Sequence, residues 1–386
     1  MVGGTQRSRR DSQLRLDGSC VADGNSVSLL VDGGEAFPAM LEAIAGAEQT
    51  IVLESYTYAD DATGRRFLDA LIARARQGVT VRVLVDGVGS FGTVIIDNDF
   101  FAPLLEVGGK LAIYRPPKPW LPRWGFWKRD HRKILVVDDR VAFIGGLNIA
   151  DEYAPESWDG GAWHDIHARV EGPVARELTK VINRTWTRVA RLPRVPALGA
   201  AVPSGNIAVQ VLESRLTRRY SIRRAYLNAI RRARNSIRIS NAYFIPDQGV
   251  RRGLRNAVKR GVTVQLLLAG QTDLHSVRYA SRATYRALMR CGIEIYEWDD
   301  RVLHAKCAVI DGCWCSIGSY NLDRRSLLHN LEANIACLDS TLGATMDGQF
   351  MRDIAHSQRI DLESWHRRPA LEMLLEQLFY RLRYFL

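Results

Sequence analysis

An internal repeat constrains the fold of this chain more than any other feature. The segment GVTVRVLVDG at residues 78–87 recurs as GVTVQLLLAG at 261–270, 183 residues later. Each copy follows an apolar segment, 50–58 or 236–244, and a helix-like segment, 64–77 or 249–260. Strand, helix and strand in this order are typical of a βαβ unit. The sequence therefore predicts an α/β fold of two similar sandwich repeats, each a mixed sheet flanked by helices, related by a pseudo-two-fold axis.

The repeat also suggests where the domains end. Between the two copies lies ARLPRVPALGAAVPSGN, residues 190–206, whose three prolines interrupt both helical and strand periodicity. We expect a tail without regular structure at 1–25, a first domain at 26–189, a linker at 190–206, a second domain at 207–350 and a C-terminal helical extension at 351–386.

Charged residues recur in step with the repeat. The pattern His-x-Lys, four residues and Asp gives His131, Lys133 and Asp138 in the first copy, and His304, Lys306 and Asp311 in the second. On a strand, each His and Lys would share a face. The two Asp residues coincide with turn signals between strands and are expected to shape hairpins. A lone histidine on a strand is usually structural, but two matching sets indicate a paired site.

Further candidates follow each motif. Gly146 and Asn148 in the first copy correspond to Ser319 and Asn321 in the second. Small residues and Asn at a strand end supply donors to an oxyanion, although the same residues also form ordinary turns. A carboxylate, Asp165 or Glu332, then begins the next strand. It either holds the far nitrogen of a motif histidine or simply completes a strand end.

The composition favours an anionic partner. The formal net charge is +11 and 47% of the residues are hydrophobic, so the chain can bury a large core and bind nucleic acid or an anionic membrane. No apolar run reaches the ~18 residues of a membrane span, so any membrane contact should be peripheral. The six cysteines lack zinc-binding spacing. They are expected to be reduced thiols in the cytosol.

An insertion rich in aromatic and basic residues precedes the first motif. Gly109 to His131 spans ten more residues than the matching Gly292 to His304, and the excess falls in YRPPKPWLPRWGFWKRDH. We expect a loop that contacts lipid headgroups through Trp120, Trp124, Phe126 and Trp127. The alternative is that these rings cover a core edge between the halves.

Two other segments allow both packing and lipid contact. Residues 214–236 carry eight arginines with apolar residues at helical intervals, which suits an ordinary surface helix or a basic helix on lipid. Residues 369–386 are apolar on much of a helix and would either pack on the core or form a shallow membrane foot.

With its twin HxKxxxxD motifs, each followed by Gly-Gly/Ser-x-Asn, the chain resembles the phospholipase D superfamily. Residues 143–153, 241–246 and 316–334 are similar to bacterial cardiolipin synthases of the short branch, which lacks two N-terminal transmembrane helices. The resemblance covers roughly residues 26–340. It implies that both motifs form one active site, with the motif Asp residues counted in the catalytic set.

The same resemblance implies residue roles. His131 and His304 would be nucleophile and general acid in either order, Lys133 and Lys306 would hold the phosphate, and Asn148, Ser319 and Asn321 would supplement them. Gly146 departs from the pattern, since the second copy has a serine there.

The residue types suit phosphodiester chemistry without metal or cofactor. A neutral imidazole can attack phosphorus to give a phosphohistidine while the other protonates the leaving alcohol. The resemblance favours phosphatidyl transfer from phosphatidylglycerol, with phosphatidylglycerol or phosphatidylethanolamine as the second lipid, at the cytoplasmic face of a bacterial membrane. Hydrolysis by a phospholipase D, a nuclease of the same superfamily and a non-catalytic membrane-binding protein are the alternatives. The sequence predicts no oligomeric state.

Overall fold

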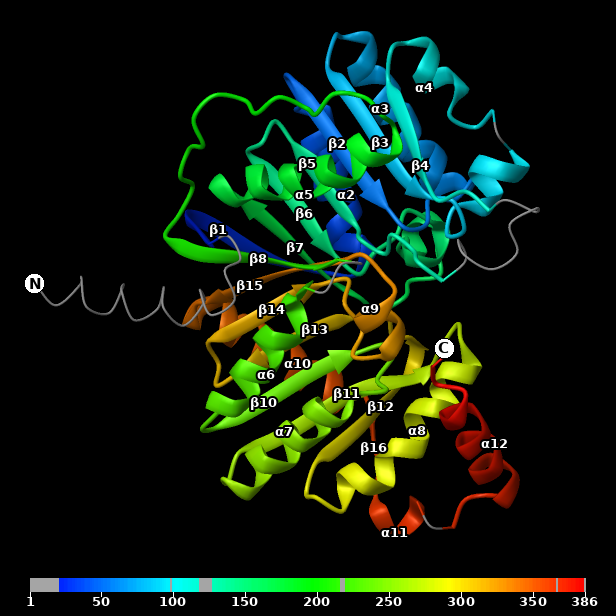
Figure 1. The fold of residues 1–386 in the computed structure, drawn as a ribbon, viewed down its shortest axis with the longest axis vertical. Coiled ribbons are helices and arrows are strands. Elements are labelled where there is room, and N and C mark those ends of the chain that lie inside the picture. The colour runs from blue at the N-terminus through cyan, green and yellow to red at the C-terminus, as the bar shows by residue number, and fades with distance from the viewer. Residues whose placement is uncertain (1–20, 98, 118–126, 216–218, 366, 385–386) are drawn as a thin grey trace, which may run out of the picture.

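The computed structural model describes residues 21–97, 99–117, 127–215, 219–365 and 367–384. They form two α/β halves, one above the other in Figure 1. The first half contains β1 (Val21–Val31), α2 (Asp32–Ala45), β2 (Thr50–Ser55), α3 (Ala62–Arg76), β3 (Thr80–Asp86), η1 (Gly92–Ile96), α4 (Ala102–Glu106), β4 (Lys110–Tyr114), β5 (Ile134–Val137), β6 (Val141–Gly145), η2 (Asp151–Tyr153), η3 (Glu156–Trp158), β7 (Ile166–Glu171) and α5 (Pro173–Val189).

The second half repeats this order and then continues beyond it. It contains β8 (Ile207–Arg215), β9 (Arg219–Tyr220), α6 (Ser221–Arg232), β10 (Ser236–Asn241), α7 (Gln248–Lys259), β11 (Thr263–Gln271), α8 (His275–Met289), β12 (Glu294–Val302), β13 (Lys306–Ile310), β14 (Trp314–Gly318), α9 (Arg324–Leu328), β15 (Glu332–Leu338), α10 (Ser340–Ala355), β16 (Gln358–Arg359), α11 (Leu362–Trp365) and α12 (Ala370–Arg381).

The two sheets share one strand order. In the first half β2, β3 and β4 are parallel, and β5, β6 and β7 continue the sheet antiparallel to one another. In the second half β10, β11 and β12 match the parallel strands, and β13, β14 and β15 match the antiparallel ones. The predicted duplicated mixed sheet is confirmed.

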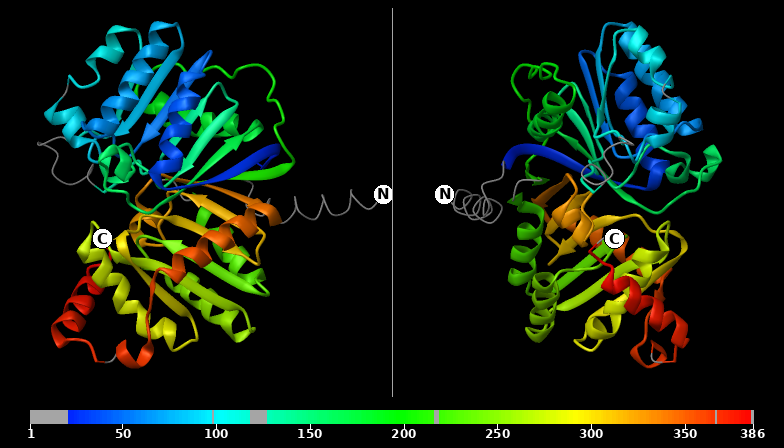
Figure 2. Two further views of the ribbon diagram at one scale, coloured as in Figure 1. Left: turned by 180° about the vertical axis from the view of Figure 1, so that it is seen from behind. Right: turned by 45° about the vertical axis from the view of Figure 1, so that its right-hand side comes forward.

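Strand β1 joins the two sheets. It pairs antiparallel with β7 in its own half and with β8 of the other, and its register shifts between Ala22 and Asn25. Seen from behind, β1 runs along the boundary between the halves (Figure 2). One buried cluster crosses that boundary, since it includes Val52 and Ile144 as well as Leu267 and Ile317. The halves therefore share a hydrophobic core.

The same local device starts the first long helix of each repeat. Asp61 precedes α3 and accepts a hydrogen bond from the N–H of Gly64, while Asp247 precedes α7 and accepts from Gly249. A carboxylate at this position satisfies N–H groups that a helix leaves unpaired. Apolar residues at helical spacing then bury one face of each helix on its sheet.

Some segment boundaries differ from the expected ones. β1 begins at Val21, so residues 21–25 belong to the sheet and not to a tail, and α10 runs across the expected boundary at 350. Residues 190–206 contain no helix or strand, and their Val195 exchanges two hydrogen bonds with Asn183 of α5. In the Arg-rich segment, α6 buries Ile222, Tyr226 and Ile230 on its sheet, as an ordinary surface helix does.

The expected membrane loop is described only at its end. Trp120, Trp124 and Phe126 lie outside the described residues, and Trp127 is partly exposed. Among the helices that the structure describes, none has both the length and the apolar character needed to cross a bilayer.

Candidate active site

A cavity of about 390 Å³ lies between the halves and receives residues from both. The first half contributes Tyr56, Thr57, His131, Asn148, Tyr153 and Trp163, and the second half contributes Tyr243, Asp273, His304, Asn321, Asp323, Ser326 and Asn330. Both motif histidines line it. Two residues 173 positions apart in the sequence thus face one space.

Each motif histidine is bound at its backbone by the other half. The N–H of His131 donates to the carbonyl of Leu331 at 2.9 Å, and the N–H of His304 donates to the carbonyl of His164 at 2.7 Å. The strands begin later than expected, at Ile134 and Lys306. The prediction that His131 and Lys133 alternate on one strand is therefore wrong, because both precede β5 and the opposite half fixes their position.

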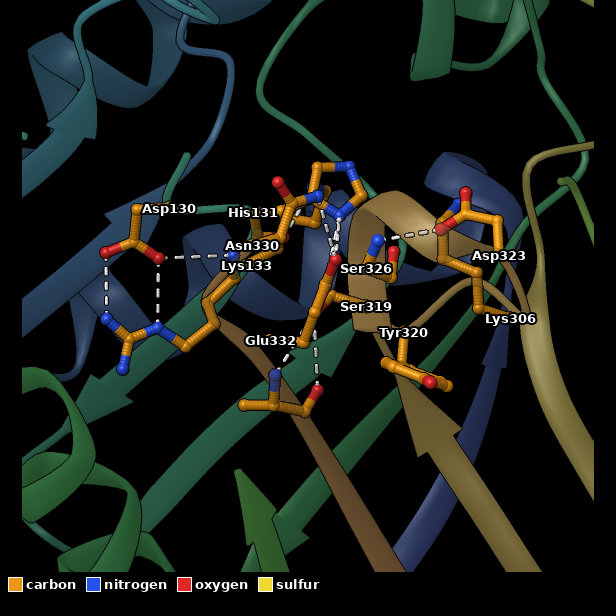
Figure 3. Close-up of polar contacts among 12 residues, drawn as sticks. Asp130, His131, Lys133, Lys306, Ser319, Tyr320, Asp323, Ser326, Asn330 and Glu332 are labelled. Atoms are coloured by element: carbon orange, nitrogen blue, oxygen red, sulfur yellow. Dashed lines mark hydrogen bonds and ion pairs between the residues drawn. The ribbon is translucent and has the colours of Figure 1, made fainter. Parts of the chain in front are cut away.

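The carboxylates that hold the histidines also cross between the halves. Nδ1 of His131 lies 3.1 Å from each carboxylate oxygen of Glu332 (Figure 3), and Nδ1 of His304 lies 2.8 Å from Oδ2 of Asp165. A carboxylate at Nδ1 favours the tautomer whose Nε2 carries the lone pair. Both carboxylates are fully buried. In this structure Asp165 and Glu332 thus contact the far nitrogens of the histidines, which is the first of the two alternatives expected from the sequence.

Burial sets the ionisation of the two imidazoles. It lowers the pKa of His131 to about 4, although the adjacent Glu332 opposes the shift. It also lowers the pKa of His304 well below its usual range, and the positive charges of Lys306 and Lys133 add to the effect. Both rings are therefore neutral at pH 7 before substrate binds, as a nitrogen nucleophile requires.

The two lysines are buried beside the histidines. Lys133 Nζ donates to the carbonyl of His131 at 2.7 Å, and Lys306 Nζ donates to the carbonyl of His304. Burial lowers the pKa of Lys133 to about 7 and lowers that of Lys306 as well. Burial thus disfavours the charged form of both lysines, and an anion beside them would favour it.

The structure explains the Gly-for-Ser difference between the copies. A Cβ atom at Gly146 would lie 2.3 Å from both carboxylate oxygens of Asp165, so a side chain there would have to displace this carboxylate. At the matching position, the Ser319 hydroxyl donates to Glu332 at 2.5 Å. In this structure Gly146 therefore leaves room for the Asp165 carboxylate, and Ser319 hydrogen-bonds the Glu332 carboxylate.

The two asparagines line the cavity but differ in their partners. Asn148 accepts from the N–H of Thr57 at 3.2 Å and donates to the Tyr153 hydroxyl at 2.7 Å. The side-chain oxygen of Asn321 is buried and has no hydrogen-bond partner among the described residues. Of this pair, Asn321 is the one with an uncommitted polar atom.

The two motif aspartates have a structural role. Asp138 accepts from the N–H groups of Glu48, Gln49 and Thr50 at 2.7–2.8 Å, and Asp311 accepts in the same way from residues 234–236. Both have positive φ, 52° each, in the turn after the motif strand. This geometry agrees with the interpretation that they shape hairpins, and the resemblance alone counts them in the catalytic set.

Sequence reasoning missed the aromatic rings around the histidines. Tyr56 lies edge-on to His131 with centroids 5.0 Å apart, and Tyr153 lies edge-on to His304 at 5.2 Å. Lys133 and Lys306 lie near the rings of Tyr56 and Tyr243. The sequence did offer a signal for these rings, because Tyr56 follows β2 and Tyr243 follows β10 at the end of matching strands.

A buried histidine also joins the halves. His164 contacts Asp32 of α2 at 2.8 Å and Asp353 of α10 at 3.3 Å, and its ring stacks on Trp298. Burial opposes its charge, but the two carboxylates outweigh it and raise the pKa of His164 to about 10. This ion triad fixes the segment that carries Asp165.

A family model described as "Cardiolipin synthase, PLD-like domain" matches residues 40–186 and 226–354. The chain is 35% identical over 336 residues to cardiolipin synthase B of Salmonella typhimurium, an alignment that covers 84% of this chain and 79% of that protein. It is 29% identical over 379 residues to cardiolipin synthase of Clostridium perfringens, covering 94% of this chain and 77% of that protein.

Solved structures agree on the fold. The crystal structure of phosphatidylserine synthase from Haemophilus influenzae matches with a TM-score of 0.74, covering 99% of this chain and all of that one at 13% identity. Polyphosphate kinase from Porphyromonas gingivalis matches with a TM-score of 0.57 over 88% of this chain and 49% of that one, at 17% identity. At these identities the matches establish the architecture alone.

Proposed function

The chain belongs to the cardiolipin synthase family with a phospholipase D-like domain, and we propose that it is a phosphatidyltransferase that makes cardiolipin from two phospholipids. One observation carries the proposal beyond family membership. Two neutral imidazoles face a single cavity, each with its Nδ1 on a buried carboxylate and a buried lysine beside it. This arrangement suits a two-step displacement at a phosphodiester.

In the first step, Nε2 of one histidine attacks the phosphorus of phosphatidylglycerol. The bond from phosphorus to the headgroup oxygen breaks, and the second histidine donates a proton to the departing glycerol. In the second step, that histidine removes a proton from a hydroxyl of the second phospholipid, whose oxygen displaces the first histidine from phosphorus. The net reaction exchanges one alcohol for another and regenerates both imidazoles.

The charges of the site fit this sequence. The bound phosphodiester anion raises the pKa of the histidine that it approaches, which supplies the proton for the leaving alcohol. Lys133, Lys306 and the amides of Asn148 and Asn321 would meet the charge that grows on the phosphoryl oxygens. These are the residues that we propose bind the phosphate.

The substrates define where the enzyme works. They are phospholipids, with phosphatidylglycerol as donor and phosphatidylglycerol or phosphatidylethanolamine as second lipid. We place the enzyme peripherally on the cytoplasmic face of the bacterial cell membrane. The net charge of +11 supports this location, because the anionic cytoplasmic leaflet attracts basic surfaces.

The test is product identity. Purified protein is incubated with phosphatidylglycerol vesicles, with or without phosphatidylethanolamine, and the lipids are analysed by mass spectrometry. Cardiolipin is the expected product, and it should disappear in both His131→Ala and His304→Ala while lipid binding is retained.

Other products would identify other functions. Phosphatidic acid as the main product would make the enzyme a phospholipase D. Cleavage of DNA without lipid turnover would make it a nuclease, and lipid binding without any product would leave a membrane-binding protein. Undiminished cardiolipin in either histidine variant would refute the shared site.

A further inference from the structure

Helix α12 exposes four leucines at and near its surface and buries one carboxylate. Leu371, Leu374, Leu378 and Leu382 are 66%, 66%, 49% and 42% exposed. Their spacing of three or four residues places them on one side of the helix; we refer to them as the α12 stripe. Glu376, in contrast, is 3% exposed and pairs with Arg368 and Arg282. A surface helix usually buries its leucines and exposes its carboxylates, and on this side α12 does the opposite.

The helix is well anchored despite this reversal. Phe379 stacks on Tyr279 of α8 with centroids 5.8 Å apart, and the Tyr380 hydroxyl accepts a hydrogen bond from Arg251 of α7 at 3.1 Å. Phe379 and Tyr380 also pack on the cluster that contains Val277 and Tyr243. Since other residues hold α12 in place, the exposed leucines are not needed for its packing.

The C-terminal end of α12 lies beside residues that line the cavity. Val277 and Tyr243, on which the end of α12 packs, are cavity-lining residues. Beyond α12, Tyr384 contacts His329 and Arg324 at α9, whose Ser326 also lines the cavity. Leu274, which precedes α8 and also lines the cavity, is 41% exposed.

The first half has a second exposed apolar group. Phe91, Ile95 and Ile96, at and within η1, are 43%, 39% and 74% exposed. The preceding loop is fixed to the cavity wall, because the Ser90 hydroxyl donates to the carbonyl of Tyr56 at 3.0 Å. Exposed apolar residues therefore flank the cavity on both halves, which single scattered side chains would not do.

We propose that the α12 stripe, together with the η1 residues, seats the protein on an anionic phospholipid bilayer with the cavity facing the lipid. This inference rests on the proposed function, which requires phospholipids to enter the cavity. Leucines on one face insert shallowly among acyl chains, while cations beside them meet lipid phosphates. The exposed Arg367 and Arg381 flank the stripe at the two ends of α12. A bilayer satisfies both the apolar and the cationic groups.

The experiment compares two triple variants. In the stripe variant, Leu371, Leu374 and Leu378 are each replaced by Gln. In the control, Leu192, Val202 and Met351, which are 39%, 61% and 46% exposed and line no part of the cavity, are replaced in the same way. Binding to phosphatidylglycerol–phosphatidylcholine vesicles is measured by co-sedimentation, and turnover is measured on vesicles and on monomeric dihexanoyl phosphatidylglycerol.

The stripe variant should lose roughly tenfold or more in vesicle binding and vesicle turnover, because three inserted leucines are lost. Its turnover of the monomeric lipid should stay within about twofold of wild type, and the control should match wild type throughout. Unchanged vesicle binding by the stripe variant would overturn the proposal. So would a dimeric wild-type protein that becomes monomeric in this variant, since the stripe would then bind a second copy.

Failure of the proposed function has a different signature. If the wild-type protein converts neither lipid, the transferase proposal fails, but co-sedimentation still tests the surface. If the wild-type protein is active and both triple variants bind vesicles equally, only the membrane surface is refuted.

Discussion

His131 and His304 are each held at Nδ1 by a buried carboxylate, but the surroundings of the two carboxylates differ. Glu332 is also contacted by the Ser319 hydroxyl and by the Asn330 amide at 3.2 Å. Burial alone would raise the pKa of Glu332, yet His131, the charge of Lys133 and the Ser319 hydroxyl together lower it. Asp165 accepts from the N–H of Ile166, and burial raises its pKa to about 7. The same function is thus met by two buried carboxylates, one with its negative charge favoured by its neighbours and one with its charge disfavoured by burial.

The difference in size follows from the neighbouring small residue. Glutamate is one methylene longer than aspartate, and the longer side chain occurs with serine at position 319. The shorter one occurs with Gly146, where a Cβ would collide with the carboxylate. Each carboxylate and its neighbour therefore form a matched pair, and exchanging one member alone should damage its half-site.

The cavity walls differ as well. Ala150 and Tyr153 lie two and five residues after Asn148, and Asp323 and Ser326 occupy the same places after Asn321. All four line the cavity. At these two positions the second half is the more polar, so the pseudo-symmetry of the backbone does not extend to the whole surface that a substrate meets.

Removal of either imidazole should have the largest effect. We expect His131→Ala and His304→Ala each to lower kcat by roughly a thousandfold or more, because each ring takes part in both steps. The kcat of the double variant should be no lower than that of the less active single variant, since the effects of groups that act together are not additive. Single-turnover kinetics would check this. A large difference between the two single variants would mean that the half-sites are not interdependent.

A methyl group at Gly146 should be the next most damaging change. In Gly146→Ala the new Cβ displaces the Asp165 carboxylate, so His304 loses its partner and kcat should fall roughly a hundredfold. Ser319→Ala only removes one contact to Glu332 and should cost about tenfold or less. Measuring kcat for both on one soluble substrate tests the matched-pair explanation, which equal losses would contradict.

The two carboxylates should also affect folding stability differently with pH. The pKa of folded Asp165, about 7, lies above its ordinary value of 3.8. The folded state therefore binds the extra proton between these values, and its stability falls as the pH rises toward 7. Asp165→Asn does not lose stability in this way. Between pH 5 and pH 8, its free energy of unfolding should therefore rise relative to that of wild type by on the order of 2 kcal/mol.

The pKa of Glu332 shifts in the opposite direction, so its effect on stability depends on pH in the opposite way. Its pKa is lowered below the ordinary 4.5, so its stabilising contribution is complete above that pH and is lost only as the pH falls through the folded pKa. Glu332→Gln should be destabilised by about 1–2 kcal/mol, equally at pH 5 and pH 8. Urea unfolding at both pH values separates the variants, and a parallel pH dependence in the two would refute the distinction.

These contrasts also mark the limits of sequence reasoning here. The 183-residue repeat was sufficient to predict the duplicated mixed sheet, because each copy contains its own strand–helix–strand pattern. The twin motifs identified both histidines. The crossing of Asp165 to His304 and of Glu332 to His131 was not predictable, since it depends on β1 joining the sheets and on the backbone bonds at Leu331 and His164. The burial of Glu376 in α12 was equally hidden, because Arg282 and Arg368 meet it only in the folded chain.

The smallest expected effect is a change in KM on replacing Asp323, which the second half contributes to the cavity wall. Burial raises the pKa of Asp323 to about 7, so this carboxyl is mostly ionised at pH 8 and mostly protonated at pH 6. It also caps α9 by accepting from the Ser326 N–H at 2.7 Å, which Asn can do equally well. Asp323→Asn should therefore fold normally and lower KM for a soluble phosphatidylglycerol by about twofold to threefold at pH 8, because a charge that repels the phosphate is gone. At pH 6 the variant and wild type should agree, and a KM difference that persists there would show that Asp323 acts through its hydrogen bonds and not through its charge.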